Sequence, residues 1–212
     1  MRRIAAAQHG VVARRQLLGA GVGEVTIKAC VAAGVMRSVH RGVYAVGDDA
    51  LSREGAWLAA ILLGGNGAVL SHRSAAALHG IRASGGAVDV TLAGPRSDKP
   101  GIRFHRAVGA LVPEDVTVVG GIPVTRVART LVDLAAALPT EELAELVGDA
   151  DRAELLDRPA LDDARERVAA AAALGRGSGA GPGEVRLRIV LARLDERNLR
   201  VDARLAVRSG GR

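Results

Sequence analysis

Glycines divide the first 47 residues into short segments of two different periodicities, and this division constrains the fold more than any other feature of the sequence. Gly10, Gly21 and Gly34 each follow a stretch that suits a helix (about 2–8, 13–19 and 23–33), and glycine at such a position closes a helix. Residues 35–39 and 43–46 are rich in valine and flank Arg41-Gly42, which is typical of two strands joined by a tight turn. The order predicts three helices and then a β-hairpin.

This order is the outline of a winged helix, and the charge of the segment suits such a module. Residues 1–47 carry seven arginines or lysines against one acid, Glu24, while the remaining residues carry 22 basic and 22 acidic groups, so the net charge of +6 lies at one end. A polyanion is attracted to that end, and phosphate neutralisation is the main sequence-independent contribution to DNA affinity. The residues expected to contact double-stranded DNA are Arg14, Arg15, Thr26, Lys28, Arg37, His40 and Arg41.

The third helix offers few groups that read base edges. Its expected exposed positions include Glu24, Thr26 and Lys28, which is one acid and one cation for the major groove. Affinity is therefore expected to depend on the second helix and the hairpin, through phosphates or the minor groove, with modest specificity or two copies of the protein. The alternative is that this module mediates protein contacts or dimerisation.

The composition predicts a globular, cytoplasmic protein. A chain of 212 residues that is 49% hydrophobic can form one large domain or two small ones. Cys30 is the only cysteine, which excludes an intramolecular disulfide and a cysteine-built zinc site and fits a reducing compartment. The longest apolar run, 56–63, is far shorter than the roughly 20 residues that cross a bilayer, and no signal peptide is evident. No membrane association is expected.

The middle of the chain is predicted to be α+β. A helix is expected over 52–63, and a second helix opens at Ser71, whose hydroxyl is placed to cap the first turn. Strands are predicted at 68–70, 88–92, 102–105, 116–119 and 122–125, and further helices at 127–137, 140–151 and 159–173.

The end of the chain is predicted to be a linker and the start of another domain. Residues 174–183 contain five glycines at alternate positions, which favours a flexible linker. Beyond it, 184–197 predicts an amphipathic helix and 199–207 a strand, but 29 residues are too few to bury their own core. We therefore predict a winged helix at 1–47, an α+β domain at 48–173, a linker at 174–183 and a truncated domain at 184–212.

Three motifs carry a family resemblance: HGVVARRQLL together with RGVYAVG, LSHRSAAALHGI at 70–81, and GIPVTRVARTLVDLA at 121–135. In this order and spacing they resemble the AbiEi-like antitoxin and transcriptional-regulator proteins of actinobacteria. The resemblance implies an N-terminal winged helix that binds operator DNA. It also implies a type IV toxin–antitoxin system in which the protein antagonises or regulates an abortive-infection toxin of nucleotidyltransferase type.

Many relatives in that family also carry a C-terminal domain similar to the very-short-patch-repair endonucleases, and the tail from Gly183 resembles its first helix and strand. Metal-assisted cleavage of DNA needs clustered carboxylates. Asp202 is alone on its expected strand, and neither lysine has an acid two residues before it. We therefore expect a truncated nuclease-like tail without catalytic residues, and a protein that is not an enzyme. The alternative function is a DNA endonuclease of that class.

The remaining polar residues favour structural roles. His72 and His79 lie seven residues apart, whereas metal ligands on one helix are normally three or four apart, so these two and His105 are interpreted as packing or surface groups. Asp133 is expected to cap or pair, and the acidic residues of 141–151 to form a solvated helix face, with a partner-binding face as the alternative. No metal or cofactor is expected. A third possible function is an interaction module whose basic face binds an acidic partner.

Overall fold

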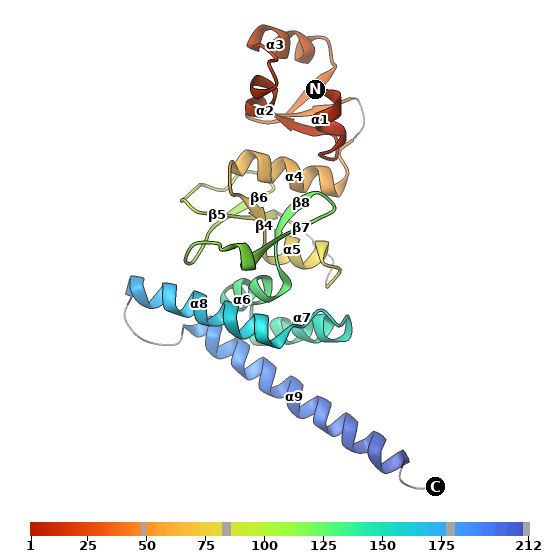
Figure 1. Cartoon of the computed structure of the whole chain (residues 1–212), viewed down its shortest axis with the longest axis vertical. Helices are drawn as coiled ribbons and strands as arrows, with labels where there is room; N and C mark the ends of the chain where they lie inside the picture. The colour runs from red at the N-terminus through yellow and green to blue at the C-terminus, as the bar shows by residue number, and fades with distance from the viewer. Residues whose placement is uncertain (48–49, 82–85, 177–180, 210–212) are drawn as a thin grey trace.

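A computed structural model of the chain describes residues 1–47, 50–81, 86–176 and 181–209, and the side chains of these residues up to 198 except those of 175–176. Figure 1 shows three parts stacked along the long axis of the molecule. The N-terminal module, residues 1–47, lies at one end, a mixed sheet lies in the middle, and a layer of helices lies at the other end. The expected α+β class is confirmed.

The N-terminal module contains the three expected helices and the expected hairpin. The helices are α1 (Arg2–Ala6), α2 (Arg14–Gly19) and α3 (Glu24–Ala32), and the hairpin strands are β2 (Met36–His40) and β3 (Val43–Val46). A further strand that was not predicted, β1 (Val11–Ala13), pairs antiparallel with β3, so the sheet order is β1-β3-β2. All three residues of β1 are buried, so the strand lacks the alternating pattern that identifies a half-buried strand.

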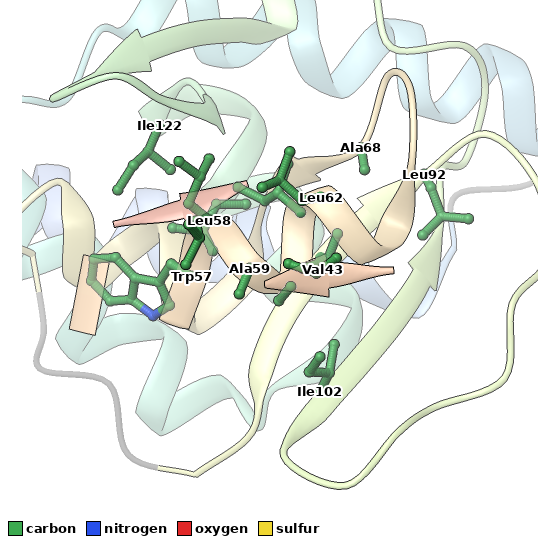
Figure 2. Packing of buried hydrophobic residues seen from close by; sticks show 14 of the residues in the cluster. Val43, Trp57, Leu58, Ala59, Leu62, Ala68, Leu92, Ile102 and Ile122 are labelled. Carbon is green, nitrogen blue, oxygen red and sulfur yellow. The ribbon is translucent and has the colours of Figure 1, made fainter. Parts of the chain in front are cut away.

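Helix α4 (Arg53–Gly64) connects this module to the rest of the molecule. It begins at Ser52, whose Oγ accepts a hydrogen bond from the backbone N–H of Gly55 at 3.0 Å. Every residue from Trp57 to Leu62 is buried, because the helix packs against β1 and β3 on one side and against β4, β5 and β8 on the other. Figure 2 shows α4 side chains in one cluster with Val43 of β3 and Ile102 of β6.

The middle sheet has the strands that the sequence predicts. They are β4 (Val69–Leu70), β5 (Val88–Leu92), β6 (Ile102–Arg106), β7 (Val116–Val119) and β8 (Ile122–Thr125), in the order β6-β5-β4-β8-β7. The β4–β8 and β5–β6 pairs are parallel, and the β4–β5 and β7–β8 pairs are antiparallel. A 3-10 turn, η1 (Pro113–Asp115), precedes β7. Helix α4 covers one face, and α5 (His72–Leu78) and α6 (Val127–Ala137) lie beyond the other (Figure 1).

The prediction that the Ser71 hydroxyl caps the first turn of α5 is wrong. Ser71 occupies the N-cap position, but its hydroxyl makes no capping hydrogen bond. It accepts a hydrogen bond from Thr91 Oγ1 of β5 at 2.8 Å instead. Because Ser71 and Thr91 are both buried, the Ser71 hydroxyl is satisfied inside the core and not by the start of the helix.

The C-terminal helices differ from the prediction. Helices α7 (Thr140–Arg152) and α8 (Arg158–Arg176) were expected, but the strand expected at 199–207 is wrong, because one helix, α9 (Pro182–Ser209), runs through it. Leucine, arginine and alanine dominate that segment and favour a helix, and no glycine or proline interrupts it. Of the residues expected to form a linker, 174–176 belong to α8 and 182–183 to α9, and 177–180 lie outside the described residues.

Candidate nucleic-acid interface

The two arginines that open α2 are held in place by neighbouring elements. Arg14 forms an ion pair with Glu24 at the start of α3. Arg15 is exposed, and its Nη1 donates a hydrogen bond to the carbonyl oxygen of Leu62 in α4 at 2.8 Å. Helix α2 therefore presents basic groups whose positions are set by α3 on one side and α4 on the other.

The turn of the β2–β3 hairpin lies beside these arginines. The backbone N–H of Arg14 donates to the carbonyl oxygen of Gly42 at 2.8 Å, which fixes the turn against the start of α2. Gly42 has a φ of +75°, a conformation that a glycine adopts without strain, and this tight turn carries the exposed Arg41. This hydrogen bond brings Arg41 close to the two arginines of α2, although they lie far apart along the chain.

These groups surround an open hollow of about 740 Å³, which we call the arginine hollow. Arg96, in the connection between β5 and β6, also lines it, although this residue was not among the predicted contact residues. Nothing in the local sequence of the turn-rich segment 94–100 indicates that it lies near α2. Only the packing of the chain brings Arg96 to the hollow. The residues that line the hollow are Arg14, Arg15, Arg41, Gly42, Tyr44 and Arg96.

The other predicted contact residues lie outside the arginine hollow. Thr26 and Lys28 are exposed on α3, which buries only Ile27. The neighbouring Val25 is 83% exposed, so the helix presents an apolar side chain to solvent as well. Most of the surface of α3 is thus exposed, and the helix carries a single cation, Lys28.

The first hairpin strand, β2, carries the two remaining predicted residues. Arg37 is exposed, opposite Ala45 of β3. His40 is half-buried beside a bulge in β2, and burial lowers the pKa of its imidazole below the ordinary value of 6.5. His40 is therefore neutral at pH 7 and adds no charge to the basic surface.

A second polar cluster lies between the middle sheet and α5. The His72 and His105 rings are stacked with centroids 3.7 Å apart, and His105 Nε2 lies 2.8 Å from Oδ1 of the buried Asp89. Burial and the neighbouring His105 lower the pKa of His72 to about 3. His79, at the end of α5, instead contacts the carbonyl oxygen of Thr125 at 2.8 Å. Within the described ranges, no group of three histidine, cysteine or carboxylate side chains is arranged to hold a metal ion.

The buried Arg129 of α6 lies at the centre of a network of ion pairs. Its side chain is 2% exposed and binds Asp115 Oδ2 at 3.0 Å and Asp133 Oδ1 at 2.9 Å. Arg167 of α8 binds the other oxygen of Asp115 at 2.7 Å. Burial raises the pKa of Asp133 despite the neighbouring guanidinium of Arg129. The expectation that Asp133 forms a pair is confirmed, and the network joins η1, α6 and α8.

The acidic start of α7 is only partly a solvated face. Glu142 Oε2 accepts a hydrogen bond from Arg73 Nη2 of α5 at 2.9 Å. This contact joins α5 to α7, and Asp151 Oδ2 of the same predicted face accepts a hydrogen bond from Asn198 Nδ2 of α9 at 3.4 Å. The glutamates of the first turn also lie where the helix dipole favours negative charge.

The chain matches no protein-family model and no curated protein. Among the described helices, none is both long and apolar enough to cross a membrane.

Proposed function

We propose that this chain is a DNA-binding transcriptional regulator of the antitoxin type, with the N-terminal module acting as a winged helix on double-stranded DNA. The observation that carries the proposal is the convergence of Arg14, Arg15 and Arg41 around one hollow beside the exposed helix α3. The motif resemblance adds a type IV, abortive-infection toxin of nucleotidyltransferase type as functional partner. The proposal places the protein in the cytoplasm, with a homo-oligomer as a possible binding form.

The distribution of groups on the module favours phosphate contact over base reading. The hollow brings together guanidiniums, which bind phosphate oxygens through two parallel hydrogen bonds. Helix α3 offers Thr26 and Lys28 to base edges, which is a small set for a recognition helix. We therefore expect binding with a large electrostatic component and modest sequence discrimination.

The test is the double substitution Arg14→Ala with Arg15→Ala, compared with Arg152→Ala and Arg188→Ala, two exposed arginines on α7 and α9. Loss of two phosphate contacts weakens binding about sixtyfold in 0.1 M salt. It also reduces the slope of the logarithm of the binding constant against the logarithm of the salt concentration by about 1.8. Mobility-shift titrations with the DNA upstream of the gene measure both quantities. Absence of binding by the unsubstituted protein at low salt contradicts the proposal.

A further inference from the structure

The end of helix α4 positions two arginines that belong to different parts of the chain. Arg15 of α2 donates to the carbonyl oxygen of Leu62 at 2.8 Å, and Arg96 Nη1 donates to the carbonyl oxygen of Gly64 at 3.3 Å. The last carbonyl groups of a helix carry partial negative charge and attract cations. The end of α4 therefore orients two guanidiniums that line the arginine hollow, one from α2 and one from the connection between β5 and β6.

Arg96 is also supported by an aromatic ring. Its guanidinium carbon lies 5.2 Å from the centroid of the Phe104 ring in β6, within the range of a cation–π contact. A guanidinium has five N–H donors, so the carbonyl of Gly64 leaves most of them for another acceptor. Arg96 is thus both exposed and pre-oriented, which lowers the entropy lost when it binds a ligand.

The charge of the arginine hollow points to an anionic ligand. Four arginines and no acidic residue line it, and the ion pair of Arg14 with Glu24 offsets only one of these charges. A concave surface of one sign raises the local concentration of ions of the other sign. The volume of about 740 Å³ exceeds that of a single phosphate group, and Tyr44 adds a phenol of the kind that contacts sugar and phosphate in DNA complexes.

We infer that Arg96 is a DNA-backbone contact, and that the bound duplex passes from the N-terminal module over the arginine hollow onto the connection between β5 and β6. The inference rests on the proposed function, because it takes the anion to be a DNA phosphodiester. It extends that function beyond residues 1–47: the middle domain supplies part of the footprint. Figure 1 shows the connection between β5 and β6 beyond α4, on the side of the molecule where α2 lies.

The test is Arg96→Ala in the full chain, with Arg152→Ala as the control of equal charge change on the distant helix α7. Fluorescence anisotropy measures the affinity for the upstream DNA and for an unrelated duplex of equal length. Loss of one phosphate contact with a salt slope of 0.9 predicts binding about eightfold weaker in 0.1 M salt and about threefold weaker in 0.3 M salt. Both duplexes should lose affinity equally, and Arg96→Lys should restore most of it.

The outcomes separate the inference from the proposed function. If the unsubstituted chain binds DNA and Arg96→Ala behaves like Arg152→Ala, the inference is overturned and the proposed function stands. If the unsubstituted chain fails to bind DNA, the proposed function itself is overturned. A thermal stabilisation by inorganic phosphate that requires Arg96, without any effect of Arg96→Ala on DNA affinity, assigns the hollow to a free anion and also overturns the inference.

Discussion

His72 combines a left-handed backbone with a ring that is covered by a second histidine. Its φ is +48°, in a region that non-glycine residues seldom adopt, and its ring stacks on that of His105. The imidazole Nδ1 also lies 3.0 Å from Ser71 Oγ. Because a charged ring in this position is desolvated and faces another imidazole, the folded protein holds His72 neutral.

This position predicts a loss of stability in acid. The pKa of His72 is lowered from 6.5 to about 3, so below pH 6.5 the unfolded chain binds a proton that the folded chain excludes. The contribution of the neutral His72 ring to the free energy of unfolding is fully present well above pH 6.5 and is lost as the pH falls toward 3. The free energy of unfolding decreases by on the order of 2 kcal/mol between pH 8 and pH 5.

The His72→Asn variant isolates this contribution, because asparagine tolerates a positive φ and does not titrate. Urea unfolding at pH 8, 6 and 5 should show a shallower decline for the variant than for the unsubstituted protein. Parallel declines in the two proteins would show that His72 does not titrate on unfolding as described.

The start of α9 shows how a segment with the composition of a linker becomes part of a core. A Cβ on Gly183 would lie 2.8 Å from Cα of Ala136 in α6, so glycine permits the close approach of the two helices. Arg186 then donates to the carbonyl oxygens of Ala135 and Ala136 at 3.0 and 3.1 Å, which satisfies the end of α6. Buried leucines further along α9 complete the contact with α6 and α7.

The substitution Gly183→Ala is therefore expected to destabilise the protein by about 1–3 kcal/mol, because the added methyl group separates α9 from α6. Gly181→Ala is the matched control: a Cβ there meets no atom within 4 Å, and its effect should be near zero. Thermal unfolding followed by circular dichroism measures both. Equal melting temperatures for the two variants would contradict the close packing at Gly183.

The molecule as a whole is organised around α4. One hydrophobic cluster includes Val11 and Val43 of the N-terminal module, Trp57 of α4, and Val90 and Phe104 of the middle sheet. The apolar run at 56–63 is thus explained: a helix between two sheets buries its residues all round and shows no polar face. The module retains only a small cluster of its own around Leu17 and Met36.

A fragment of residues 1–47 is accordingly expected to be unfolded when it is produced alone. Without α4, the inward faces of Val11, Ala13 and Val43 are exposed to water, and a chain of this size has little other core to offset their exposure. A proton–nitrogen NMR spectrum of the fragment should show the narrow amide dispersion of a disordered chain, whereas the full chain should show wide dispersion. Wide dispersion in the fragment would contradict the dependence on α4.

Most elements were predictable because their signals lie within a few neighbouring residues. Valine-rich strands, apolar residues at helical spacing and closing glycines gave the hairpin, the strands of the middle sheet and the helices through α8. The strand β1 was missed and a strand was wrongly expected at 199–207. The strand β1 is buried on all sides, and the end of α9 continues a helix that began at Pro182.

The sequence by itself determined that the chain is α+β and that its excess positive charge lies in the first 47 residues, since composition and periodicity are local properties. The tertiary structure alone placed Arg96 beside Arg41, stacked His72 on His105, and packed α9 against α6. These contacts join residues far apart in the chain, and their geometry depends on how α4 and the sheets pack together. No local pattern of residues encodes such a distance.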